Sequence, residues 1–226
     1  MSPAPSITRA YRLAMAACTP FVRWWGRLEV TGLECVPASG PLLIVGNHDS
    51  YWDPVAIGIA GLPRRQIQAL AKSSLWKVPG LSRVLDGMGQ IPIVRGAGDG
   101  HAMDRAIEAL RAGACIGVFP EGTRSLGREL RARSGLGRLA EAVPEAEIVC
   151  VAVQGTVDIP RFPKRPRVRV HFFQPAEGRS LPSEDAKQLP VRLLAEIRAL
   201  APIAAAGRRP RPVESAEPAP AADAAS

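Results

Sequence analysis

The sequence predicts an α/β fold: a single domain with a largely parallel central sheet flanked by helices. Short apolar runs bounded by Gly and Pro alternate along the chain with segments of helical periodicity. This alternation is typical of strand-helix units with parallel strands. Several runs are apolar without interruption, which indicates strands covered on both faces. A chain of 226 residues with 46% hydrophobic residues is long enough to bury one full core.

Short amphipathic helices are predicted in residues 1–27. Ser6 can cap a first helix in which Tyr11 and Met15 share an apolar face, and Thr19-Pro20 restarts the chain as a second helix. The second helix sets aromatic residues against basic ones: Phe21, Trp24, Trp25, Arg23 and Arg27. An apolar face with Trp, bordered by Arg, suits a helix lying in a membrane interface. The same face could instead pack on the domain.

Residues 28–200 are predicted to form the main domain. Its expected strands are residues 27–31, 42–45, 66–71, 91–94, 114–119, 148–153 and 167–173. Its expected helices are residues 53–60, a Gly/Pro-punctuated group after Lys72, and residues 101–112, 136–142 and 183–200, the last capped by Ser183. Residues 201–226 are rich in Ala, Pro and Glu, which predicts a disordered tail.

The charge balance indicates an anionic partner. The formal net charge is +8, which favours nucleic acid, a phosphorylated metabolite or an anionic membrane. Aromatic residues are scarce and no nucleic-acid-binding motif is present, so nucleic acid is the weaker choice. The four cysteines are scattered and predict a reducing compartment. Because no signal peptide and no apolar stretch of ~20 residues is found, we expect a peripheral protein on the cytoplasmic face of a membrane.

The sequence from Gly46 to Pro54 carries the strongest candidate for catalysis. His48 follows the predicted buried strand at residues 42–45, and parallel sheets place ligands at such strand ends. A turn between His48 and Asp53 would let the carboxylate fix the imidazole tautomer and leave the other nitrogen as a base. In the alternative reading, Asp53 only caps the next helix, accepting from the N–H groups of its first turn. His101 and His171 lack ligand-like neighbours, so no metal site is expected.

Further charged residues follow the other predicted strands. They are Lys72, Arg95, Glu121 and Arg124. Parallel strands would bring these ends and His48 to one edge of the sheet, forming a site for an anionic substrate that carries a hydroxyl. Gly122 would let a ligand approach the backbone closely. The alternatives are surface ion pairs for the arginines, a Glu121–Arg124 pair that holds the loop, and a solvated Lys72.

Three blocks resemble the glycerophospholipid acyltransferases, particularly the 1-acylglycerol-3-phosphate acyltransferases. The blocks are Asn47-His48-x-x-x-x-Asp53, Gly89-Gln90-Ile91-Pro92-Ile93-Val94-Arg95 and Phe119-Pro120-Glu121-Gly122-Thr123-Arg124-Ser125. The resemblance covers about residues 28–157. A fourth block departs from the family pattern, because Ala152 stands in Val151-Ala152-Val153 where the family usually has Pro.

The resemblance implies a glycerol-3-phosphate acyltransferase-like fold and transfer of an acyl group from acyl-CoA or acyl carrier protein to the free hydroxyl of 1-acylglycerol 3-phosphate, giving phosphatidic acid. It makes His48 the base and Asp53 its orienting acid, with no cofactor and no metal. It assigns substrate binding to Asn47, Lys72, Arg95, Glu121, Gly122, Thr123 and Arg124. Lyso-ornithine lipid, glycerol 3-phosphate or a glycolipid are alternative acceptors, and a non-catalytic membrane-surface lipid-binding protein is the alternative class.

Overall fold

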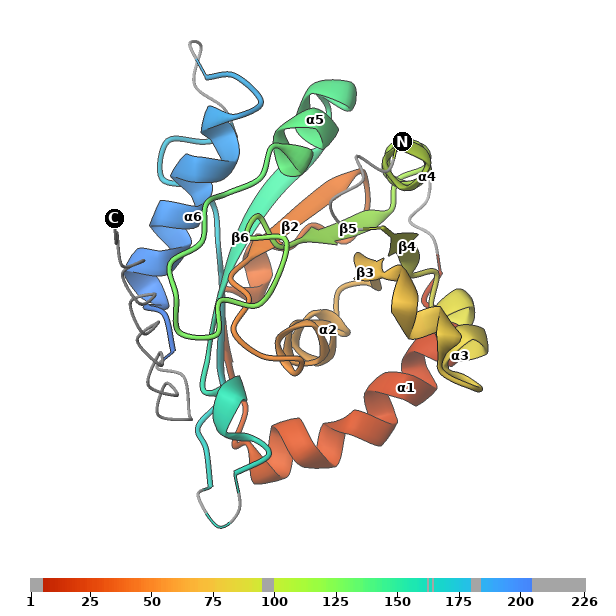
Figure 1. The fold of residues 1–226 in the computed structure, drawn as a ribbon, viewed down its shortest axis with the longest axis vertical. Helices are drawn as coiled ribbons and strands as arrows, with labels where there is room; N and C mark the ends of the chain where they lie inside the picture. The colour runs from red at the N-terminus through yellow and green to blue at the C-terminus, as the bar shows by residue number, and fades with distance from the viewer. Residues whose placement is uncertain (1–5, 95–99, 162, 164, 180–183, 205–226) are drawn as a thin grey trace, which may run out of the picture.

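A seven-stranded sheet runs through the molecule in the order β1-β7-β6-β2-β5-β3-β4 (Figure 1). The computed structural model describes residues 6–94, 100–161, 163, 165–179 and 184–204. The strands are β1 (Glu29–Thr31), β2 (Leu42–Gly46), β3 (Ile67–Lys72), β4 (Ile91–Ile93), β5 (Cys115–Val118), β6 (Glu147–Gln154) and β7 (Arg169–Phe173). All neighbours pair in parallel except β6 and β7, which are antiparallel. The largely parallel α/β domain is therefore confirmed.

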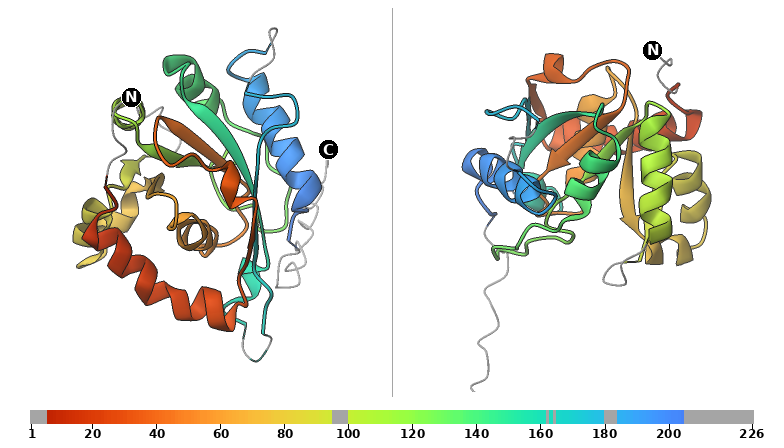
Figure 2. Two further views of the ribbon diagram at one scale, coloured as in Figure 1. Left: turned by 180° about the vertical axis from the view of Figure 1, so that it is seen from behind. Right: turned by 90° about the horizontal axis from the view of Figure 1, so that it is seen from above.

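Helices cover both faces of this sheet (Figures 1 and 2). The α-helices are α1 (Arg9–Thr19), α2 (Asp53–Gly61), α3 (Leu81–Gly87), α4 (Gly100–Arg111), α5 (Gly135–Ala142) and α6 (Gln188–Leu200). Short helices are the π-helix η1 (Pro20–Trp25) and the 3-10 helices η2 (Leu33–Cys35), η3 (Ser73–Lys77) and η4 (Thr156–Asp158). Helix α2 lies between α1 and the sheet, while α5 and α6 cover the opposite face.

Strand β2 is the centre of the core. Leu43 and Val45 pack with buried residues of α4, α5 and α6, whereas Leu42 and Ile44 pack with those of α1 and α2. Successive side chains of a strand point to opposite faces, so an unbroken apolar run serves both layers. A central strand that is buried along its whole length therefore leads directly into the His48 loop.

The N-terminal helix packs into the same core and begins differently from the prediction. Tyr11 and Met15 are buried, as their shared apolar face predicts. Thr8, rather than Ser6, is the N-cap, and its side-chain oxygen accepts from the N–H of Tyr11 at 3.2 Å. The chain also does not restart at Pro20, because α1 continues directly into the π-helix η1.

The C-terminal helix begins later than predicted. Helix α6 starts at Gln188, and the expected cap Ser183 lies outside the described residues. One Asp185 carboxylate oxygen accepts from the N–H groups of Lys187 and Gln188, each at 2.8 Å. This carboxylate thus satisfies donors at the helix start, as a capping side chain does. Most of the predicted tail, residues 205–226, also lies outside the described residues.

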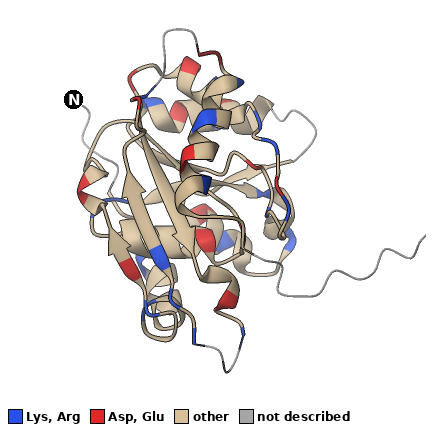
Figure 3. Ribbon diagram, turned by 90° about the vertical axis from the view of Figure 1, so that its left-hand side faces the viewer, with Lys and Arg blue, Asp and Glu red and all other residues tan. Residues whose placement is uncertain are grey.

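Charges of both signs are interspersed on the side of the molecule that carries α6. Figure 3 shows acidic and basic positions alternating along the helices there, with no uninterrupted basic stripe on this side. A groove that binds a nucleic-acid backbone needs a continuous concentration of positive charge. This side of the fold therefore has the charge pattern of an ordinary solvated surface.

Candidate active site

The carboxyl ends of β2, β5 and β6 meet at one edge of the sheet. His48 follows β2, Glu121 follows β5 and Thr156 follows β6. The backbone N–H of His48 donates to Glu121 Oε2 at 2.7 Å. Two segments far apart in sequence are thereby joined at the point where parallel strands place ligands.

His48 and Asp53 form a buried pair. The His48 Nδ1 atom lies 3.1 Å from Asp53 Oδ2, and the imidazole is stacked on the ring of Phe119 with centroids 4.4 Å apart. An ionised carboxylate only accepts hydrogen bonds, so this contact assigns the proton to Nδ1. In the neutral imidazole the lone pair is then on Nε2, which is the tautomer required of a general base.

Asp53 does not cap its own helix in the way one reading of the sequence expected. Its Oδ2 atom accepts from the N–H groups of Asp49 at 2.6 Å and Ser50 at 2.7 Å, both of which precede α2. Its Oδ1 atom accepts from the Thr156 hydroxyl. The reason is that helical side chains tilt toward the N-terminus, so a residue at the first helical position lies over the preceding loop. Together with His48, four donors fix this carboxylate.

Asn47 joins two strands. Its side-chain oxygen accepts from the N–H of Val153 at 2.8 Å, and its amide donates to the carbonyl of Val153 at 2.9 Å. The same amide lies 3.2 Å from Asp49 Oδ2. Asn47 is fully buried, so the structure shows it aligning β2 and β6.

Glu121 pairs with an arginine that the sequence did not indicate. Arg198, on α6, contacts Glu121 Oε1 at 2.5 Å and both carboxylate oxygens of Asp49 at 2.9 Å. Burial raises the pKa of Glu121, although Arg198 and the N–H of His48 oppose that shift. Burial also opposes ionisation of Asp49, but hydrogen bonds from Arg198 and Ser125 outweigh it and lower the pKa of Asp49. The predicted alternative, a Glu121–Arg124 pair, is wrong.

The loop after Glu121 is shaped by contacts with its own chain. Gly122 has a φ of +69°, and a Cβ there would lie 2.6 Å from Arg133 Cδ. The backbone conformation therefore favours glycine, and any side chain there would also displace the Arg133 side chain. Thr123 is exposed. The Arg124 guanidinium lies 3.6 Å from the centroid of the Tyr51 ring.

The other predicted cations are not brought to His48 by any contact of the described residues. Lys72 ends β3 and is exposed, and β5 lies between β3 and β2. Two strand spacings amount to about 10 Å. Arg95 lies outside the described residues.

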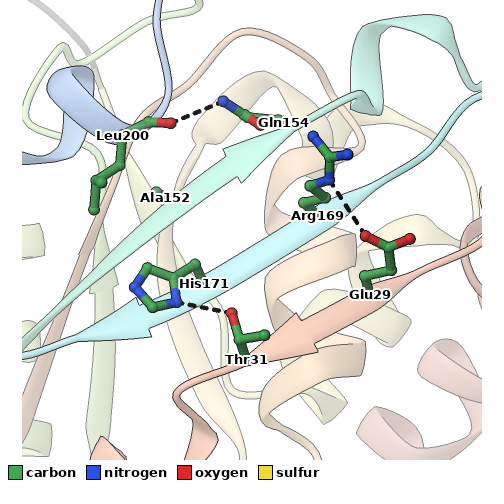
Figure 4. A pocket seen from close by; sticks show the side chains of 7 residues that line it. All are labelled: Glu29, Thr31, Ala152, Gln154, Arg169, His171 and Leu200. Carbon is green, nitrogen blue, oxygen red and sulfur yellow. Dashed lines mark hydrogen bonds and ion pairs between the residues drawn. The ribbon is translucent and has the colours of Figure 1, made fainter.

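A cavity of about 230 Å³ lies elsewhere, beside β1, β7 and β6 (Figure 4). None of the predicted site residues lines it. Its polar side chains are occupied with protein partners: Thr31 with His171 at 2.8 Å, Arg169 with Glu29 at 3.3 Å, and Gln154 with the Leu200 carbonyl at 2.8 Å. We therefore place the candidate site at His48.

Two further features are absent from the described residues. None of their helices is long and apolar enough to cross a membrane. They also hold no group of three or more His, Cys, Asp or Glu side chains arranged to bind a metal ion.

Comparison with known proteins shows the family of this chain. The family model described as Acyltransferase matches residues 27–160, more than half of the chain, and this segment contains His48, Asp53 and Glu121. The chain belongs to this acyltransferase family. Arg198 and the whole of α6 lie beyond the matched segment, so the family match alone does not point to them.

The acyltransferase has curated relatives in bacteria. A 1-acyl-sn-glycerol-3-phosphate acyltransferase of Borreliella burgdorferi is 36% identical over 124 residues, which are 53% of this chain and 48% of the relative. The match thus spans about half the length of that relative. A Bacillus subtilis protein of the same name is 24% identical over 178 residues, covering 77% of this chain and 88% of the relative.

A solved structure shares the fold. The crystal structure of the 1-acyl-sn-glycerophosphate acyltransferase PlsC from Thermotoga maritima superposes with a TM-score of 0.59 and 22% sequence identity. The match covers 86% of this chain and 83% of that one. The likeness therefore extends through most of the α/β domain.

Proposed function

We propose that this acyltransferase moves a fatty acyl group from an acyl thioester to the free hydroxyl of 1-acylglycerol 3-phosphate at a membrane surface. The observation that carries the proposal is the His48–Asp53 pair, held at 3.1 Å at the carboxyl end of β2. The names of the Borreliella and Bacillus relatives support this acceptor.

The reaction requires one base. His48 Nε2 removes the proton of the acceptor hydroxyl while the hydroxyl oxygen attacks the thioester carbonyl. Asp53 stabilises the resulting imidazolium. The C–S bond then breaks, releasing the thiolate and forming an oxygen ester. A thiol has a pKa of about 8.5, so its thiolate leaves with little acid assistance. General-base catalysis of this kind contributes about 10²–10⁴ in rate, and the mechanism proposed here uses no metal or cofactor.

Basic residues at the carboxyl edge of the sheet supply the charge for the acceptor phosphate. Arg124 is the described candidate, because its guanidinium follows β5 on the same loop as Glu121 and lies beside Tyr51. A guanidinium suits phosphate because its planar fork binds two oxygens. Arg95 and Lys72 are proposed as further contacts to the acceptor or to the acyl donor, which is acyl-CoA or acyl carrier protein.

Thiol release tests this function directly. Palmitoyl-CoA is incubated with and without lysophosphatidic acid, using wild type and His48→Ala. Acceptor-dependent release that vanishes in the variant is expected. Release without acceptor would indicate a thioesterase, and turnover only with lyso-ornithine lipid, glycerol 3-phosphate or a glycolipid would move the proposal to that acceptor. A biological role that survives His48→Ala would favour a non-catalytic lipid-binding protein.

We propose that the enzyme binds peripherally to the cytoplasmic face of the membrane, and exposed aromatic side chains beside the site support contact with a membrane surface. Phe21 is 54% exposed, Trp24 66% and Tyr51 69%. The Phe21 ring lies 5.8 Å from that of Trp52, which connects η1 to the His48 loop. Trp and Phe near Arg are the residues that an interfacial helix uses.

Co-sedimentation with vesicles tests this surface. Trp24→Ser is expected to reduce binding to vesicles containing phosphatidic acid, because it removes an exposed apolar ring. Val191→Ser is the control, since Val191 is 56% exposed on α6. Equal binding by both variants would contradict a membrane role for η1.

A further inference from the structure

Arg198 is the cation that directly contacts two of the buried carboxylates around His48. Its side chain is 14% exposed and its guanidinium contacts Asp49 and Glu121, whose side chains are 6% and 1% exposed. It also donates to the carbonyl of Ala201 at 3.3 Å. A planar guanidinium is suited to bridging two carboxylates in this way.

Two chains of contacts run from this guanidinium to the peptide groups of His48. Through Glu121, the first reaches the N–H of His48 at 2.7 Å. Through Asp49, the second reaches the Ser125 hydroxyl, and the N–H of Ser125 donates to the carbonyl of His48 at 2.8 Å. The backbone of His48 is thus held on both sides by groups that Arg198 joins.

The charges make this arrangement dependent on Arg198. Burial disfavours the charged guanidinium, but its hydrogen bonds to Asp49 and Glu121 outweigh that cost and raise the pKa of Arg198. Asp49 also acts on Glu121 as a like charge. Without the cation, two buried carboxylates would repel each other, and one would take up a proton or move toward solvent.

We propose that Arg198 is a positioning residue for acyl transfer, which aligns the His48 peptide by joining Asp49 to Glu121. The proposal rests on the function proposed above. It assigns to α6, beyond the segment that defines the family match, a part in the reaction. Arg198 acts through Asp49 and Glu121.

Steady-state kinetics of the full chain test this role. With lysophosphatidic acid as acceptor, Arg198→Met is expected to lower kcat about 100-fold, because a misplacement of about 1 Å costs that much. The acceptor KM should change less than about threefold, since no substrate contact is removed. Arg198→Lys keeps the charge but not the planar fork, so its kcat should be about tenfold higher than that of Arg198→Met.

Arg192 provides a matched control on the same helix. Its guanidinium pairs with Glu184 at 2.8 Å and Glu196 at 2.9 Å, and its side chain is 17% exposed. Arg192→Met therefore removes a similar double ion pair away from His48. We expect Arg192→Met to lose about as much thermal stability as Arg198→Met, but to keep kcat within about twofold of wild type. Equal kcat values for Arg198→Met and Arg192→Met would overturn the proposal.

The pH profile separates positioning from general stability. Without Arg198, the pKa of Glu121 should rise further, so Glu121 would take up a proton at higher pH. The acid limb of kcat in Arg198→Met should then move to higher pH. Arg192→Met should leave the acid limb of the kcat profile unchanged. If the limb is unchanged in both variants, Arg198 is not a positioning residue.

A spectroscopic readout keeps the test independent of the acceptor. The chain has three His residues, so the His48 imidazole signal can be assigned in NMR spectra by its loss in His48→Ala. Arg198→Lys and Arg198→Met should shift that signal, whereas Arg192→Met should not. If wild type turns over no lysophosphatidic acid, the proposed function fails but this result still decides the role of Arg198. If Arg198→Met does not fold, Arg198→Lys decides it.

Discussion

Two groups of polar residues at the carboxyl edge of the sheet differ in how they are held. The site floor comprises Asn47, His48, Asp49, Asp53, Glu121, Ser125 and Thr156, which are all buried. The site rim comprises Lys72, Thr123 and Arg124 together with Tyr51. The polar side chains of the floor all have hydrogen-bond partners, since no buried side-chain nitrogen or oxygen among the described residues lacks one. In the rim, by contrast, Lys72, Thr123 and Tyr51 are exposed to solvent.

The difference separates two tasks of the enzyme. Buried hydrogen bonds fix the floor before substrate binds, which is what the proposed proton transfer from a hydroxyl requires. Exposed side chains in the rim can adjust to a phosphate and to different acceptors. We therefore expect floor variants to lower kcat or stability, and rim variants to raise the acceptor KM.

The largest effect is expected for Asp53→Asn in the floor. Asparagine offers one oxygen to the four donors that surround Asp53, and it cannot stabilise the imidazolium of His48. We expect kcat to fall by roughly 10³–10⁴-fold with little change in KM. Asp104→Asn, at an exposed position of α4, is the control. A loss of less than tenfold would show that His48 does not depend on Asp53.

Asp49→Asn should destabilise the floor in a pH-dependent way. At neutral pH it breaks a buried ion pair with Arg198, at a cost of about 3 kcal/mol. The folded pKa of Asp49 is lowered, so its stabilisation is fully present above the unfolded value of about 3.9 and is lost as pH falls through the folded value. Urea unfolding should show that the difference in unfolding free energy between wild type and Asp49→Asn becomes smaller below about pH 4. A difference that does not change with pH would contradict this prediction.

Much of the fold could be predicted from sequence because its signals are local. The apolar run of β2 is buried on both faces, and each predicted strand is present with small shifts at its ends. The His48–Asp53 contact was predictable because the two residues lie only five positions apart, with one turn between them. The other partners of Asp53 were not predictable, and the helix-cap reading was wrong, because those partners depend on the path of the loop before α2.

The remainder of the floor could not be predicted because it depends on packing between distant segments. Arg198 lies 77 residues from Glu121 and reaches it only when α6 packs on the sheet. Thr156 lies 103 residues from Asp53, at the end of β6. Neither belongs to a local motif, so both appeared in the sequence as ordinary helix and loop residues.

A smaller effect is expected for Thr156→Val. The substitution preserves shape but removes the hydroxyl that donates to Asp53, leaving one carboxylate oxygen short of a partner. We expect kcat to fall about tenfold, which corresponds to about 1.4 kcal/mol in the barrier. Thr156→Ser keeps the hydroxyl and should retain most of the activity. Equal losses in both variants would point to packing in place of the hydrogen bond.

The smallest effect is expected in the rim, for Arg124→Met. Arg124 is partly exposed, and its guanidinium donates to the Tyr51 hydroxyl at 2.8 Å, so a phosphate would have to share or displace this contact. Solvent screening limits such an ion pair to about 1 kcal/mol, so the acceptor KM should rise about fivefold while kcat is kept. The difference between wild type and variant should shrink as salt is added. Arg128→Met, an exposed arginine in the same loop, should leave KM unchanged. A fall in kcat for Arg124→Met at constant KM would place Arg124 with the floor, because only groups that act in the transition state give that pattern.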